Sequence, residues 1–350
     1  MSEERLKKKN GGFNWLTAIK FKKISAYAIG FLIFSFLLYL GGVEALKTAF
    51  KPNIYYLIIC FIAFASAFLV NSIRWGYISN KIEKRKVCSR FEYFFYFVNS
   101  FFLGEYISKV GGDFFLRPGF LNKRHNVPFK RALLAISLEK FLDLLFIFLF
   151  LTPAILYVSG IFNNWQAFLS IFVLLSVFCF FFVFRNHIFI NICKKFFLNF
   201  FTFLKKVPLI QKLVKNSYIN KFENLHKFDL LERNSLIALF FLSILRFVFL
   251  GIRIYFLSAA LGLKIPAFLL FSGIPIAQVG LIIGFTPGAL GILEGGWYAV
   301  LAAAGIAKEI ITAFLIGQRV YWTLFTGLIF LVSYLFFGFI NAKKAKACEK

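Results

Sequence analysis

Six charged side chains lie within or beside long apolar segments of the sequence: Glu139, Asp143, Arg246, Arg253, Glu294 and Arg319. At the centre of a bilayer each would cost about 2.5–3.5 kcal/mol if unpaired, so each must pair, reach the interface or face water. Glu139 and Asp143 are four residues apart and share one face of a helix. We expect Glu139 and Arg319 to line a site for a polar substrate. Arg253 and Lys140 fit equally well as cations that extend to the interface.

Two glycine-rich breaks carry acidic residues, at Gly111-Gly112-Asp113 and at Pro287-Gly288-Ala289-Leu290-Gly291-Ile292-Leu293-Glu294. Glycine and proline leave backbone N–H groups free, and a half-helix that starts after such a break directs its positive end toward an anion. A phosphate would suit either break. The alternative is a kink that lets helices pack closely, because glycine is common in membrane helices.

The composition indicates where these residues must sit. Of 350 residues, 60% are hydrophobic, 53 are phenylalanine and only 16% are charged, with 41 Lys and Arg against 15 Asp and Glu. Soluble domains carry about 25% charged residues, so a soluble enzyme is excluded. A nucleic-acid-binding protein would also be basic, but it would not place its phenylalanines in long uncharged runs, and we expect no nucleic-acid partner. The composition is typical of a polytopic membrane protein whose loops hold the charge.

Runs of about 20 mostly apolar residues predict membrane spans, and six segments fit: Ile24–Leu40, Ile54–Val70, Leu133–Val158, Ala167–Phe184, Ser235–Leu261 and Ile310–Ile340. Two further stretches, Phe91–Phe120 and Ile265–Ala304, are apolar but are interrupted by glycine and charge. The sequence therefore predicts an all-α polytopic membrane protein with six full spans and two re-entrant broken-helix elements. Irregular backbone at membrane depth requires protein or water around it, so we expect the two elements to line a shared polar cavity.

The basic loops set the expected topology. They flank Phe91–Phe120 on both sides, and the positive-inside rule places them in the cytoplasm. We therefore expect Phe91–Phe120 to enter and leave from the cytoplasmic side, and Ile265–Ala304 from the outer side. Both chain ends would then be cytoplasmic, in a protein of the cytoplasmic (inner) membrane. The predicted parts are a basic N-terminus (1–23), one transmembrane domain (24–340) and a basic tail (341–350).

The spacing of special residues predicts an inverted repeat. Gly111 lies 37 residues after Arg74 and 28 before Glu139; Gly291 lies 38 after Arg253 and 28 before Arg319. The repeat halves are 54–158 and 235–340, and a basic amphipathic cytoplasmic linker (185–234) lies between them. Inverted repeats with broken helices are typical of transporters that bind substrate near the midplane.

Together these motifs resemble the lysylphosphatidylglycerol synthase transmembrane region family, also called flippase-like membrane proteins. The resemblance rests on Pro287-Gly288-x-x-Gly291-x-x-Glu294, Gly111-Gly112-Asp113 with Arg117, Glu139 with Asp143, and Arg319. Ala289 stands where a third glycine is common in the family. The resemblance implies lipid translocation, of an aminoacylated phospholipid or a polyprenyl-phosphate-linked sugar for example, without the soluble aminoacyltransferase domain of bifunctional members.

The leading hypothesis is a lipid translocase, not an enzyme, that moves an anionic or phosphate-headed lipid. We expect no cofactor and no metal, because the chain has no phosphate-binding lysine loop and no His/Cys cluster. The predicted translocation cavity comprises Arg74, Gly111, Gly112, Asp113, Arg117, Glu139, Asp143, Arg253, Pro287, Gly288, Gly291, Glu294 and Arg319. Glu139 and Arg319, at equivalent repeat positions, are expected to pair. The alternatives are a membrane-embedded transferase that uses Asp113 and Glu105, and a non-transporting partner of a separate lipid-modifying enzyme.

Overall fold

The computed structural model describes residues 42–106, 111–184, 233–283 and 287–348, with isolated positions at 32, 35 and 39. Every regular element in these ranges is helical, which confirms the all-α prediction. Four helices are long and apolar enough to cross a membrane: Ile54–Glu83, Phe129–Val158, Asn234–Ala260 and Lys308–Gly338. Most of the predicted first span and nearly all of the linker 185–234 lie outside the described residues.

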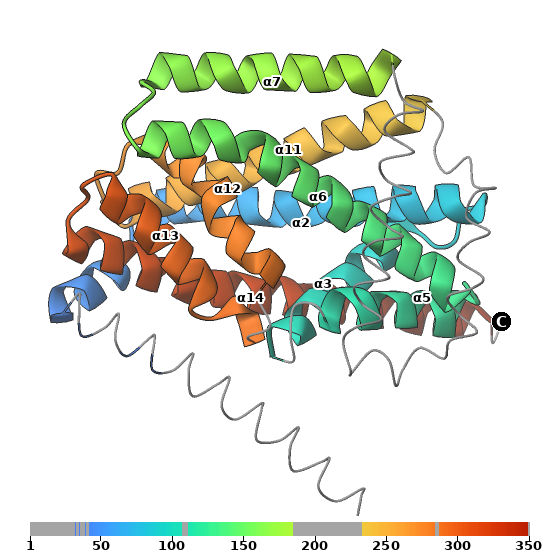
Figure 1. Ribbon diagram of the computed structural model, residues 1–350. Helices are drawn as coiled ribbons and strands as arrows, with labels where there is room; N and C mark the ends of the chain where they lie inside the picture. The colour runs from blue at the N-terminus through green and yellow to red at the C-terminus, as the bar shows by residue number, and fades with distance from the viewer. Residues whose placement is uncertain are drawn as a thin grey trace, which may run out of the picture.

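The centre of the fold is an antiparallel pair of helices, α2 (Ile54–Glu83) and α11 (Arg233–Ala260). Asn53 begins α2, since its side chain accepts the N–H of Tyr55, and its own N–H donates to the carbonyl of Ala260 at 2.7 Å. The end of α11 is thus fixed beside the start of α2. Figure 1 shows the two helices running together through the middle of the molecule, between α7 (Asn164–Phe184) on one side and α14 (Lys308–Cys348) on the other.

The first broken-helix element consists of α3 (Arg90–Tyr106), a π-helix η1 (Gly112–Leu116) and α5 (Arg117–His125). A Cβ on Gly112 would lie 2.9 Å from the Cα of Gly104 and would also collide with the carbonyl of Ser100. Only glycine therefore allows η1 to approach α3 this closely. Helix α6 (Phe129–Val158) follows and packs against α2, η1 and α5.

The second broken-helix element consists of α12 (Ala267–Ile283), a 3₁₀ turn η3 (Pro287–Ala289) and α13 (Ile292–Ala303). The break adopts positive φ at Gly288 (60°) and Gly291 (86°), a region that glycine enters without steric cost. Helices α12 and α13 pack through small residues: a Cβ on Gly296 would lie 2.8 Å from the Cα of Ala277. Because η3 contacts α3, the two broken elements meet.

Helix α14 has 41 residues, a length of about 60 Å at 1.5 Å per residue. It begins near the start of the predicted span Ile310–Ile340 and continues to Cys348, so residues 341–348 of the predicted tail extend the same helix. The predicted spans that start at Leu133, Ala167 and Ser235 also form helices. The re-entrant path of the broken elements, the inverted repeat and the orientation in the membrane stay predictions.

Candidate functional site

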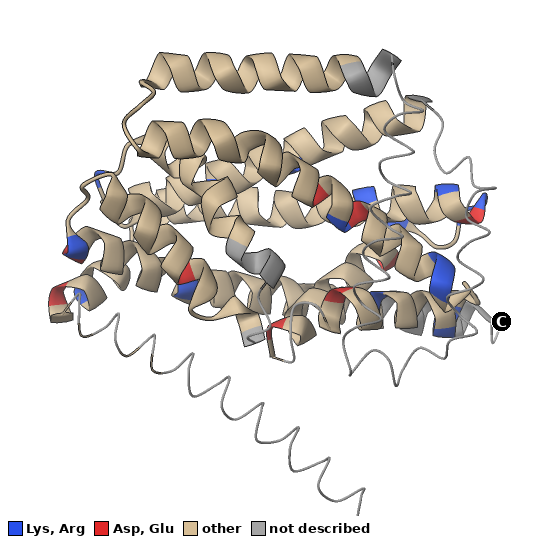
Figure 2. Cartoon of the chain, in the orientation of Figure 1, with Lys and Arg blue, Asp and Glu red and all other residues tan. Residues whose placement is uncertain are grey.

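A network of buried charges joins α2, α6 and α11. The side chain of Arg74 is fully buried; its Nη2 lies 2.6 Å from Asp143 Oδ1 and 3.5 Å from Glu139 Oε1, and its Nη1 donates to Ser243 Oγ at 3.1 Å. Arg246 Nη1 approaches the same Asp143 oxygen at 3.0 Å. Glu139 and Asp143 share one face of α6, as their spacing predicts, and Figure 2 shows acidic and basic positions side by side midway along that helix.

The first broken-helix element supplies the rest of this network. Arg117 Nη1 lies 3.1 Å from Glu139 Oε2, and Arg117 Nη2 lies 2.6 Å from Asp113 Oδ1. The Arg117 guanidinium also lies 4.3 Å from the ring centroid of Phe97. Lys140 Nζ reaches Asp113 Oδ2 at 2.6 Å. The π-helix matters here, because it begins the turn that directs both Asp113 and Arg117 toward α6.

We call these seven side chains the ionic cluster: Arg74, Asp113, Arg117, Glu139, Lys140, Asp143 and Arg246. The cluster holds four cations and three carboxylates, so it carries one excess positive charge. Removing either partner of a buried pair leaves an uncompensated charge at a cost of about 3–5 kcal/mol. The contacts of Lys140 show that it pairs with an acid, and its side chain remains about one-third exposed.

A second charged group forms where the second broken element meets α14. Arg319 Nε donates to Glu294 Oε1 at 2.8 Å, and Arg319 Nη1 donates to the carbonyl of Gly288 at 3.1 Å. The other oxygen of Glu294 accepts the N–H of Gly291 at 2.8 Å. A Cβ on Gly288 would lie 2.8 Å from Glu105 Oε2, so this carboxylate of α3 lies directly beside the break.

These contacts correct two expectations. Glu139 pairs with Arg74 and Arg117, and Arg319 pairs with Glu294, so the expected Glu139–Arg319 ion pair is wrong. The start of α13, expected to bind an external anion, instead binds the carboxylate of its own Glu294. At each break the acidic residue therefore pairs with a basic residue of the same half of the chain. That basic residue lies a few positions away or on the next helix, and so it is closer than the residue at the equivalent position of the other half.

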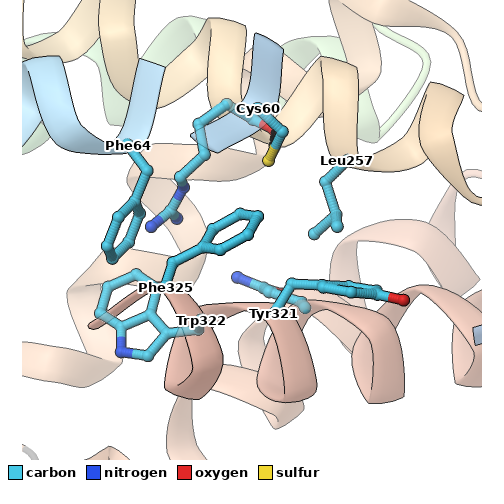
Figure 3. Close-up of a pocket in the computed structure, with 8 residues that line it drawn as sticks. Cys60, Phe64, Leu257, Tyr321, Trp322 and Phe325 are labelled. Carbon is cyan, nitrogen blue, oxygen red and sulfur yellow. Dashed lines mark hydrogen bonds between the residues drawn. The ribbon is translucent and has the colours of Figure 1, made fainter. Parts of the chain in front are cut away.

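Arg253 lies apart from both charged groups. It lines a small cavity between α2, α11 and α14, whose other lining residues are Cys60, Phe64, Leu257, Gln318, Tyr321, Trp322 and Phe325. Figure 3 shows aromatic side chains of α2 and α14 around this space, among them Phe64, Trp322 and Phe325. The expected cavity between the two broken elements stays a prediction, because residues 107–110 and 284–286 at the two breaks lie outside the described residues.

One grouping of metal-ligand side chains occurs in the described part of the chain, at Cys88, Glu92 and His125. Their ligand atoms lie within 4.8 Å of one another. Glu92 Oε2 already accepts the N–H of Ser89 at 2.8 Å, and His125 Nε2 lies 3.0 Å from the Tyr96 hydroxyl. These hydrogen bonds explain the grouping without a metal: Glu92 caps the start of α3, and His125 joins the end of α5 to α3.

A family model described as "Lysylphosphatidylglycerol synthase TM region" matches residues 25–330. The chain belongs to this family. No curated protein and no solved structure matches it. The matched range contains the whole ionic cluster, both glycine-rich breaks and every residue that lines the cavity beside Arg253. The last of these residues along the chain is Phe325.

Several of the side chains that complete these sites were not among the predicted cavity residues: Lys140, Arg246, Ser243, Gln318 and Trp322. Arg246 and Lys140 carried a visible signal, a charge within an apolar run. Gln318 and Trp322 carried none, because a glutamine or tryptophan in a helix is common in any membrane protein. Pro287 lies in η3 as expected, and Gly111 continues the helical backbone into η1.

Proposed function

We propose that this protein translocates a lipid with an anionic or phosphate headgroup between the leaflets of the membrane. The family supports a role in lipid handling, and the observation that carries the proposal is the ionic cluster between spanning helices. Seven charged side chains in one largely buried network are costly to maintain for packing alone, since apolar residues of similar volume often stabilise a protein equally well or better. Charges at membrane depth are typical of substrate pathways.

The basic and the acidic side chains suit the two charged groups in the headgroup of an aminoacylated phospholipid. Its phosphate needs guanidinium or backbone N–H donors, and its amino group needs a carboxylate. In the proposed mechanism the headgroup exchanges with ion pairs of the ionic cluster and with the Arg319–Glu294 pair, while the acyl chains remain in lipid. The protein would require no cofactor, and it would lie in the cytoplasmic membrane with both ends of the chain in the cytoplasm.

The test is a reconstitution assay. Vesicles containing the full chain and a fluorescent lipid, either aminoacylated phosphatidylglycerol or a polyprenyl-phosphate sugar, are compared with empty vesicles for transbilayer movement. We expect faster movement with at least one headgroup, and a loss of that movement in Glu294→Gln. Movement no faster than in empty vesicles for every headgroup would overturn the proposal.

A membrane-embedded transferase is the weaker candidate. Its expected base, Asp113, lies 2.6 Å from both an arginine and a lysine nitrogen, which holds it as an acceptor in ion pairs. A role as the membrane partner of a separate lipid-modifying enzyme would instead be supported if such an enzyme co-purified with the chain and translocation required it.

A further inference from the structure

The cavity beside the central helix pair contains two buried polar side chains. Arg253 of α11 is 7% exposed and Gln318 of α14 is 6% exposed, and both line the same space. The remaining lining is apolar or aromatic apart from the Tyr321 hydroxyl, which donates to the carbonyl of Ala49 at 3.0 Å. Apart from the Cys60 thiol, which donates to the carbonyl of Arg253, and the indole N–H of Trp322, the side chains of Arg253 and Gln318 supply the remaining polar groups of this cavity.

Arg253 differs from the other arginines at membrane depth. Arg74, Arg117, Arg246 and Arg319 each lie within 3.5 Å of a carboxylate oxygen. In the described part of the chain no carboxylate lies within 4.0 Å of the Arg253 guanidinium, which instead lies 4.5 Å from the ring centroid of Trp322 and 5.4 Å from that of Phe64. Contact with aromatic faces offsets part of the cost of burying the charge but leaves its N–H donors unused.

Gln318 has no hydrogen-bond partner within the described residues either, although its amide lines the cavity. A polar side chain with so little exposure and no partner is destabilising unless it binds something. Two such side chains from different helices, facing one small space, are explained together by a ligand that accepts hydrogen bonds from both.

We propose that Arg253 and Gln318 form an anion-binding site that holds the phosphate of a lipid headgroup within the membrane. This inference rests on the proposed function and assigns the phosphate contact to one of its arginines. A guanidinium can donate two parallel N–H groups to phosphate oxygens, and the glutamine amide can donate a third. The cavity as it stands has room for about one water molecule, so a phosphate would enter as α14 moves away from the central helix pair, with Phe64, Trp322 and Phe325 around it.

Binding is tested with the purified full chain in detergent, using dioctanoyl phosphatidylglycerol and, as the phosphate-free comparison, dioctanoylglycerol. We expect the wild type to bind the phosphatidylglycerol more tightly. Arg253→Gln should raise its Kd about tenfold or more, the loss of a charged hydrogen bond of about 1.5 kcal/mol. Gln318→Leu should raise it less, and Arg253→Lys should retain part of the affinity. Arg131→Gln is the control, because that side chain is half-exposed and pairs with Glu83 far from the cavity.

The outcomes separate this inference from the proposed function. Equal affinity of wild type and Arg253→Gln for phosphatidylglycerol would overturn the site, even if translocation continued. Arg253-dependent binding without translocation in vesicles would leave the site standing and remove the translocase. Displacement of the lipid by inorganic phosphate at millimolar concentration would show that the site takes free phosphate, which would overturn the lipid assignment. If Arg253→Gln does not fold, Arg253→Lys and Gln318→Leu decide the matter.

Discussion

Arg74 and Arg253 lie on opposite sides of the centre of one antiparallel helix pair, and only Arg74 is surrounded by carboxylates. Ser243 lies opposite Arg74, and Cys60 lies opposite Arg253, whose carbonyl accepts the Cys60 thiol at 3.3 Å. The two arginines occupy equivalent places in the proposed repeat. One neutralises acids on α6, whereas the other faces aromatic rings, so the two halves provide different electrostatic environments.

The ionic cluster predicts energetic coupling between Glu139 and Arg117. Glu139→Gln and Arg117→Gln should each lower the free energy of unfolding by about 3 kcal/mol, the low end for a broken buried pair, because each remaining side chain keeps a second partner. The double variant should lose less than the sum, with a coupling of about 0.5–3 kcal/mol in denaturant titrations.

The matched comparison is Glu139→Gln combined with Arg319→Gln. These residues share no partner in the structure, so their effects on stability should add within about 0.5 kcal/mol. Coupling between Glu139 and Arg319 as strong as that between Glu139 and Arg117 would contradict the pairing described above.

Gly112→Ala should disrupt the first broken element. The new methyl group would collide with the carbonyl of Ser100 and lie 2.9 Å from the Cα of Gly104, both backbone atoms. Overpacking of this kind costs about 1–3 kcal/mol, measurable as a lower melting temperature. Gly119→Ala in α5 is the control, because nothing lies within 4 Å of its Cβ, and alanine there should be neutral or stabilising. Equal melting temperatures for both variants would contradict this account.

Ala289→Gly should raise the melting temperature. Ala289 has φ of 53° within the second break, where an L-residue with a Cβ carries about 1–2 kcal/mol of strain. Glycine removes that strain but loses about 0.5–1 kcal/mol through the entropy of the unfolded chain, so a net gain of up to about 1.5 kcal/mol is expected. Ala302→Gly, exposed in α13, should instead destabilise. The prediction fails if Ala289→Gly destabilises as much as Ala302→Gly.

Acidification should destabilise the end of α5 through His125. Partial burial, with Arg124 and Arg85 nearby, lowers the pKa of His125 below its ordinary value near 6.5, against the opposing effect of Glu92. Because the folded-state pKa is the lower one, the stabilising contribution is present above about pH 6.5 and is lost as pH falls through the folded-state value. Wild type should therefore lose more stability between pH 7.5 and 5 than His125→Gln, measured by thermal unfolding. An equal or smaller loss in wild type would sink the idea.

The helices could be predicted from the sequence because each depends on a local signal. Long apolar runs marked α2, α6, α11 and α14, a glycine pair with a nearby acid marked the first break, and glycine with proline marked the second. The four-residue spacing of Glu139 and Asp143 placed them on one face of α6 without any knowledge of the fold.

The choice of partners could not be predicted, because it depends on the rotation and separation of packed helices. Equivalent repeat positions suggested that Glu139 would meet Arg319, yet Arg117, brought close by the π-helix, is the neighbour that the fold supplies. Arg253 likewise has no acidic neighbour because of how α2, α11 and α14 pack around it. No sequence pattern distinguishes it from Arg74.

The loose attachment of α14 has a consequence for how a headgroup could enter. Helices α2 and α11 have the most extensive contact in the fold, whereas α14 contacts them sparsely and rests mainly on α3 and α13. The cavity lies along this seam, with Arg253 on the firmly joined side and Gln318 on the other. If the seam separated, the cavity would open sideways to lipid between α14 and the central helix pair, and a headgroup could enter without crossing the protein.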